Sequence, residues 1–205
     1  MLYLATASTE RVRDAMRAGH LGQITGPGSN RVVPGVPFAL DNGTVRVVDG
    51  HPVRDPDWNP ERWARWLDRQ PRDRCLFAVV PDWVGDPDRT DDLWHRYAPV
   101  VRALGFPTAY AIQNRCAATP PDCDVVFVGG DNQWKESVAA LDLAVRSGKP
   151  RHMGRVNTKR RLRLAGRDGY DTVDGTFLGF GPDANLPRLL RYLRAANHPT
   201  LFSHG

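Results

Sequence analysis

Apolar and polar positions along the chain form two kinds of segment that alternate. Short runs rich in β-branched and aromatic residues, such as CLFAVVPD at 75–82, are typical of strands buried on both faces. Seven segments have this character: 2–7, 38–41, 75–82, 108–113, 124–130, 150–154 and 170–174. The pattern therefore predicts seven strands.

The stretches between these strands predict helices. The first runs over 8–19, where Ser8 or Thr9 is placed to cap the start and Gly19 to end the helix. Five more helices are expected, at 59–70, 88–105, 134–148, 157–169 (from an Asn cap) and 185–197. Residues 22–37 are rich in Gly and Pro and are expected to form a loop.

Strands that alternate with helices, without a repeat or a linker, indicate one α/β domain over 1–205 with a parallel sheet. A (β/α)8-type barrel usually needs about 200 residues or more. No eighth strand is evident, so we leave open whether one closes the barrel or whether the barrel is incomplete or distorted. A doubly wound open sheet is the alternative, but no Gly-rich dinucleotide fingerprint follows the first strand.

The composition indicates a soluble protein, with 41% hydrophobic and 25% charged residues. No apolar run approaches the roughly 20 residues of a membrane span, and the first residues show no signal peptide. We therefore expect a cytoplasmic protein without a membrane partner. Cys75, Cys116 and Cys123 are odd in number and widely spaced, which argues against disulfides and a zinc site. No metal or cofactor is predicted.

Positive charge is concentrated in one segment. The net charge is +5, and 151–167 holds many Arg, with Lys159 and His152, but no acidic residue. Such a patch is typical of a surface that binds phosphates. A solvated helix face is the alternative.

Polar residues stand where the predicted strands end. In a barrel, the carboxyl ends of the strands carry the catalytic groups. These ends hold Asp41, Asp82, Gln113, Gly129-Gly130-Asp131, Gly154-Arg155 and Asp174. Each residue alone would suit a turn or a helix cap. Together they predict one cup with three carboxylates, an amide, and glycines that let a ligand approach the backbone.

Five segments resemble, in order, motifs of the tRNA-guanine transglycosylase superfamily, which exchanges bases in tRNA and includes DNA-acting relatives. They are LDNG (40–43), VVPD (79–82), AIQN (111–114), FVGGDNQWKE (127–136) and HMGRVNTKRRLRLAGRDGYDTVDGT (152–176). The resemblance implies that Asp174 is the nucleophile and Asp41 the general acid/base. It also implies that the base is bound by Asp82, Gln113, Gly129 and Gly130.

The chain departs from the family pattern at three points. Thr44 stands in place of the second Gly after the first motif, and the loop after Gly130 reads DNQWKE. The zinc subdomain that holds tRNA in the family is missing. These departures favour DNA over tRNA as the partner, and a monomer or weak dimer over the family dimer.

The function predicted is excision of a modified base by an N-glycosylase that flips the base out of the stack. Trp83 and Trp134 are placed to stack on that base or to pack in the core. Phosphate contacts are expected from Arg155, Lys159, Arg160, Arg161 and Arg163. The breadth of the family suggests defence against phage DNA. The alternatives are a transglycosylase that inserts a deazapurine into DNA or tRNA, and a non-catalytic nucleic-acid-binding barrel.

Overall fold

Eight parallel strands close into a barrel in this computed structural model, which describes residues 1–48, 51–116, 118–179 and 181–197. Around the barrel the strands follow the order β1-β10-β9-β8-β7-β6-β3-β2. Their bounds are β1 (Leu2–Ala5), β2 (Gly22–Thr25), β3 (Phe38–Leu40), β6 (Cys75–Val79), β7 (Thr108–Ile112), β8 (Val125–Val128), β9 (Arg151–Met153) and β10 (Thr172–Asp174). The predicted (β/α)8-type barrel is confirmed, and it is closed.

The eighth strand is β2, within the segment expected to be a loop, so that expectation was wrong for 22–25. A Cβ at Gly22 would lie 2.6 Å from the Leu4 side chain and 2.9 Å from the Pro37 carbonyl oxygen. This glycine therefore allows neighbouring segments to approach closely and does not mark a turn. Strand β2 pairs with β1 on one side and β3 on the other, which completes the ring.

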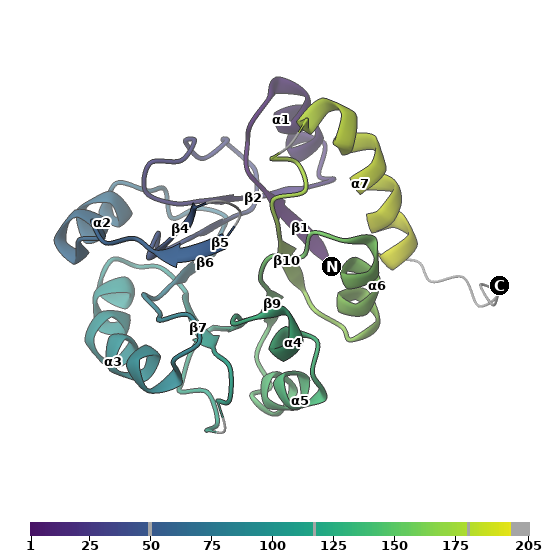
Figure 1. Cartoon of the computed structure of the whole chain (residues 1–205). Coiled ribbons are helices and arrows are strands. Elements are labelled where there is room, and N and C mark those ends of the chain that lie inside the picture. Colours follow the sequence, from purple (N-terminus) through teal and green to yellow (C-terminus); the bar gives the residue numbers. More distant parts are fainter. Residues whose placement is uncertain (49–50, 117, 180, 198–205) are drawn as a thin grey trace.

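Helices surround the barrel (Figure 1). They are α1 (Glu10–Arg17), α2 (Pro60–Asp68), α3 (Pro87–Ala103), α4 (Asn132–Lys135), α5 (Val138–Arg146), α6 (Lys159–Arg167) and α7 (Pro182–Asn197). Thr9 caps α1 as expected, because its hydroxyl accepts from the Val12 N–H. Gly19, just past the end of α1, has φ +77, the left-handed conformation that suits a helix stop.

The helices differ from the prediction at several boundaries, and two of these differences have a local cause. The expected helix 134–148 is divided, because the Ser137 side chain accepts from the Ala140 N–H and starts a new helix there. Thr158, not Asn157, caps α6. The Asn157 side chain instead accepts from the Thr176 N–H and joins the ends of β9 and β10.

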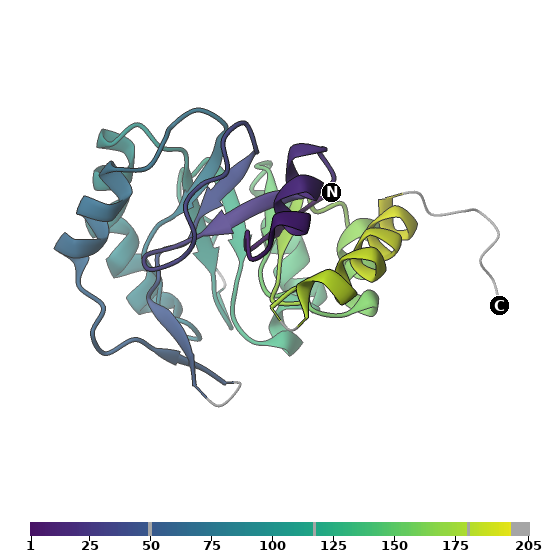
Figure 2. The same ribbon diagram turned by 90° about the horizontal axis from the view of Figure 1, so that it is seen from above.

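The connections between strands are not uniform. Antiparallel strands β4 (Val45–Val48) and β5 (His51–Arg54), which the sequence pattern did not indicate, form a hairpin that projects beyond the barrel in Figure 2. No helix joins β2 to β3, where residues 26–37 form a loop. The buried Gln23 side chain fastens this loop, since it donates to the Arg31 carbonyl at 2.9 Å and accepts from the Val33 N–H at 2.8 Å.

Side chains alternate between the barrel interior and the layer under the helices. The interior cluster is Leu4, Ala39, Phe77, Val79, Ala109 and Val125, and the larger cluster packs the helices onto the barrel. By the same alternation, Asp41, two positions beyond Ala39, points to the barrel axis. So does Gln113, which is four positions beyond Ala109. Among the described residues, no helix is long and apolar enough to cross a membrane.

Candidate active site

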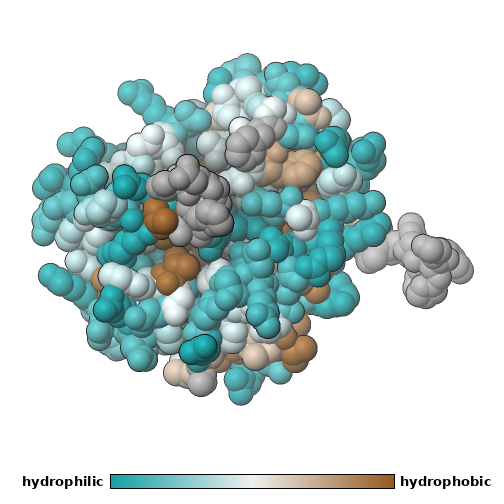
Figure 3. Space-filling model, in the orientation of Figure 1, coloured by the Kyte–Doolittle hydropathy of each residue, from teal (hydrophilic) through white to brown (hydrophobic). Residues whose placement is uncertain are grey.

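The polar residues expected at strand ends meet at one end of the barrel. Asp41 and Gln113 directly follow β3 and β7, and Asp174 is the last residue of β10. Asp82 lies in the loop after β6, and Gly129-Gly130 follows β8. We call this end of the barrel, where the polar residues meet, the mouth. The face of the molecule seen in Figure 3 is mostly hydrophilic.

Asp174 is held through one of its two carboxylate oxygens. Its Oδ1 accepts from the Arg155 backbone N–H at 3.1 Å and lies 3.0 Å from His152 Nε2. Its Oδ2 makes no hydrogen bond within the part of the chain that the structure describes. The side chain is 16% exposed. The carboxylate is therefore fixed in orientation and has one oxygen available to a ligand.

His152 anchors Asp174 from inside the barrel. The imidazole is fully buried and packs against Phe127, with 4.6 Å between ring centroids, and against Phe77, at 5.0 Å. Its Nδ1 lies 2.8 Å from the Thr172 hydroxyl. Because both ring nitrogens have a partner and two rings restrict the imidazole, His152 sets the position of the Asp174 carboxylate.

Arg155 has a backbone conformation that is rare outside glycine, with φ +56. Such conformations cost free energy and concentrate at functional sites. Here the conformation directs the Arg155 N–H at Asp174, while the guanidinium donates to the Gly130 carbonyl at 3.0 Å. Arg155 thus links the loop after β9 to the glycine loop after β8.

Asp41 lies at the mouth and is exposed to solvent on one side. Protein atoms surround its carboxyl group on the other sides. Burial among these atoms, and then the negative charges of Asp174 and Asp82, raise the pKa of Asp41 to about 6. The Asn42 N–H, which donates to Oδ1 at 2.8 Å, acts in the opposite sense. Because the residue is exposed at the open mouth, water also screens its charge. Asp41 can therefore carry a proton near neutral pH, as a general acid must.

Asp82 and Gln113 lie together beneath the mouth, and both are buried. Gln113 donates to Asp82 Oδ2 at 2.6 Å, and Asn42 donates to Oδ1 at 2.8 Å. Burial raises the pKa of Asp82, and hydrogen bonds from Asn42 and Thr44 oppose that rise. The two residues expected to read a base are thus joined to each other in one buried network.

Gly130 begins the loop after β8 and has φ +76. A Cβ there would lie 2.2 Å from Asn114 Oδ1 and 2.9 Å from Trp134 Cδ1. Asn114 and Asp131 exchange hydrogen bonds across this point. The glycine is therefore needed for the close approach of two loops, and Trp134 packs against the hydrophobic core beside it.

Lys135 is a buried lysine next to the site, only 3% exposed. Its Nζ donates to the Gly154 carbonyl at 2.9 Å. Burial, followed by the positive charge of Arg155, lowers the pKa of Lys135 to about 8, while Asp174 opposes the shift. Lys135 thus places a positive charge close to Asp174 at neutral pH.

Trp83 and the basic residues of α6 are partly engaged by other side chains. The guanidinium groups of Arg54 and Arg89 lie 4.0 and 4.3 Å from the centre of the Trp83 ring. Arg160 and Arg161 both pair with Glu136. Lys159 and Arg163 are exposed and pair with no carboxylate among the described residues. The basic segment therefore carries less free charge than its composition suggests.

Three residues of the site were not predicted from the sequence: Asn42, Lys135 and His152. His152 was counted only as part of the basic segment, although its place two residues before Gly154 puts it on the inner face of β9. Lys135 lies in a polar, loop-like stretch, and nothing local indicates that it is buried. Asn42 follows Asp41 in the LDNG motif, to which the resemblance assigns a role at Asp41 only.

The described residues contain no group of three or more His, Cys, Asp or Glu side chains that could hold a metal ion. All three cysteines are free thiols. No family model matches the sequence, and no curated protein matches it closely enough to show a relationship.

Proposed function

We propose that the protein is a nucleic-acid N-glycosylase that removes a modified base, with DNA as the favoured substrate, and a minimal relative of the tRNA-guanine transglycosylases. One observation carries the proposal. Two carboxylates at the mouth have different environments: Asp174 is fixed through Oδ1 by donors, whereas Asp41 has a pKa raised to about 6. Enzymes that cleave glycosidic bonds commonly use two such groups, an ionised carboxylate and a carboxyl group that donates a proton.

The reaction follows from these two environments. As the bond between C1′ and the base nitrogen breaks, its electron pair leaves with the base and positive charge develops at C1′. Asp174 Oδ2 faces this charge and either stabilises it or forms a transient ester. Asp41 gives its proton to the leaving base and then, as a carboxylate, takes a proton from the water that attacks C1′.

Neighbouring residues support each step. The Arg155 N–H holds Asp174 in place. The positive charge of Lys135 nearby limits the repulsion between Asp174 and Asp41. The linked pair of Asp82 and Gln113 offers acceptor and donor groups to the base edge. The target base must leave the stack to reach these groups, and modified or mismatched bases do so at the lowest cost.

The test is mass spectrometry of free bases released from DNAs of different modification, phage DNA with modified bases first, and from bulk tRNA. We expect a released base with wild-type protein and none with a folded Asp174→Asn variant. Release that persists in Asp174→Asn, or no release from any substrate, would refute the proposal. Incorporation of a labelled deazapurine would identify base exchange instead of hydrolysis.

A further inference from the structure

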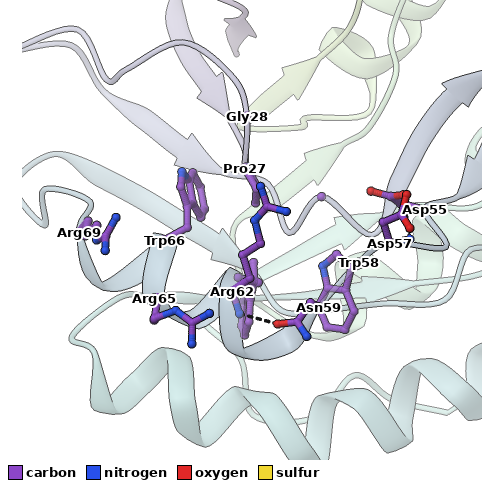
Figure 4. A pocket seen from close by; sticks show the side chains of 12 residues that line it. Pro27, Gly28, Asp55, Asp57, Trp58, Asn59, Arg62, Arg65, Trp66 and Arg69 are labelled. Atoms are coloured by element: carbon purple, nitrogen blue, oxygen red, sulfur yellow. Dashed lines mark hydrogen bonds between the residues drawn. The ribbon is translucent and has the colours of Figure 1, made fainter.

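A groove of about 390 Å³ lies outside the barrel, beside the mouth and apart from the two aspartates (Figure 4). One wall is helix α2, and the other includes Pro27 and Gly28 of the loop that replaces a helix between β2 and β3. Its size is within the range of ordinary ligand sites. Nothing in the proposed reaction uses this groove, so its lining calls for a separate explanation.

Three arginines line the groove: Arg62 and Arg65 of α2, and Arg69, the residue that directly follows α2. Their spacing of three and four residues places them on one face of the helix. All three are exposed, and none forms an ion pair or a side-chain hydrogen bond with another described residue. In contrast, Arg160 and Arg161 of α6 share Glu136. The groove therefore presents three unpaired positive charges on one face.

The groove also contains aromatic and acidic groups in an ordered arrangement. Trp66 and Arg69 lie at one end, and Trp58 lies with Asp55 and Asp57 at the other (Figure 4). Asp55 is 3.9 Å from Arg46, which partly balances its charge. Phosphates would be favoured at the arginine end and repelled from the acidic end. Tryptophan rings offer stacking surfaces, and carboxylates accept from base amino groups.

The groove connects directly with the mouth. Gly43, two residues after Asp41, forms part of its lining, and the Trp58 indole donates to the Asn42 carbonyl at 3.0 Å. Asn42 itself donates to both Asp41 and Asp82. A strand whose target nucleotide occupies the mouth can therefore continue into the groove without crossing the barrel.

We propose that this groove binds a single-stranded segment of the substrate next to the flipped nucleotide, with phosphates on Arg62, Arg65 and Arg69 and a base against Trp58 or Trp66. The inference rests on the proposed function for the choice of nucleic acid as ligand. Guanidinium groups interleaved with aromatic rings favour a strand with bases over an acidic peptide, which carries charge without stacking surfaces.

The experiment measures binding of fluorescein-labelled single-stranded DNA of 4, 8 and 12 nucleotides by anisotropy, over a range of salt concentrations. The test variant is R62Q/R65Q/R69Q. The control is R188Q/R191Q/R194Q, which removes the same charge from exposed positions of similar spacing on α7, on the opposite side of the barrel in Figure 1. Circular dichroism verifies that both variants are folded.

We expect the α2 variant to bind the 12-mer about 10- to 100-fold more weakly at 0.1 M salt. Its salt slope should fall by about 2, because three phosphate contacts on a single strand contribute roughly 0.7 each. The control should stay within about threefold of wild type. A 12-mer with 5-iodouracil should crosslink under ultraviolet light to Trp58 or Trp66, as mapped by mass spectrometry.

Unchanged 12-mer affinity in the α2 variant would overturn the inference. So would equal weakening in the α7 control, or displacement of the DNA by polyglutamate as effective as that by unlabelled DNA of equal charge. The two proposals fail separately. Arginine-dependent binding without release of any base would refute only the proposed reaction, whereas base release with α2-independent binding would refute only the groove.

Discussion

Replacing Asp41 by Asn should stabilise the protein at neutral pH. Asn keeps the acceptor oxygen that Asp41 offers to the Asn42 N–H but carries no charge. In the wild-type protein the ionised Asp41 carboxylate is repelled by Asp174 and Asp82. Their negative charges help to raise the pKa of Asp41 from 3.8 to about 6. The substitution removes that repulsion.

The size of the effect follows from the pKa shift. About two units at roughly 1.4 kcal/mol per unit gives a ceiling of about 3 kcal/mol. Because Asp41 is exposed and water screens its charge, we discount this to about 1 kcal/mol. For a chain of this length, that gain corresponds to a rise in Tm of about 2–4 °C.

The raised pKa of Asp41 also determines how the stability changes with pH. Between pH 4 and 6, Asp41 ionises in the unfolded chain but keeps its proton in the folded protein, so wild-type stability falls as the pH rises. The advantage of Asp41→Asn should be absent near pH 3.8, grow up to about pH 6, and remain constant above it.

Urea unfolding of both proteins at several pH values measures this difference. A double-mutant cycle with Asp174→Asn tests its cause, since the gain from Asp41→Asn should shrink when Asp174 is already uncharged. An Asp41→Asn protein that is less stable at pH 7, or a stability difference that does not depend on pH, would refute the reasoning.

Three further predictions concern the supports of the site. His152→Leu should lower the free energy of unfolding by about 1–3 kcal/mol, because Thr172 loses its buried partner and Asp174 keeps only the Arg155 N–H among the donors that the structure describes. A urea series that includes Thr172→Val, which should cost less, checks this, and a neutral result would contradict it. Gly130→Ala should lower the free energy of unfolding by on the order of 1–3 kcal/mol, because the added methyl group meets Asn114. Gly19→Ala is the control: the φ is similar, but nothing lies within 4 Å, so the loss should be smaller. Equal losses in thermal unfolding would exclude the proposed collision. Neutralising Lys159, Arg160 and Arg161 should lower the salt slope of DNA binding by less than about 2, because Glu136 already pairs with both arginines. A larger change in the salt titration of DNA binding would show that these ion pairs open on binding.

The barrel and the positions of the polar strand ends could be predicted because they depend on short-range patterns. Alternation with period two places Asp41, Gln113 and Asp174 on the same side as the interior residues of their strands, and parallel strands end at one edge. These rules need only local spacing. They therefore located the candidate catalytic residues without any information on contacts between distant segments.

Features that depend on tertiary contact could not be predicted. Gly22 resembles a turn residue unless the approach of Leu4 and Pro37 is known. Glu136 lies 24 residues before Arg160 in the chain, so composition alone overstated the charge of the basic segment. The groove combines residues from the loops after β2 and β3, the segment after β5, and α2, none of which forms a motif alone.

The loop at 26–37 has a consequence for local stability. A helix in this place would protect its amides with a continuous ladder of hydrogen bonds, whereas this loop is held by a few turns and by the side chains of Gln23, Thr25 and Asn30. Segments of this kind open at a small fraction of the free energy needed for global unfolding. If the groove binds a strand as proposed, this wall is the part that can adjust to it, while β3, and with it Asp41, stays paired in the barrel.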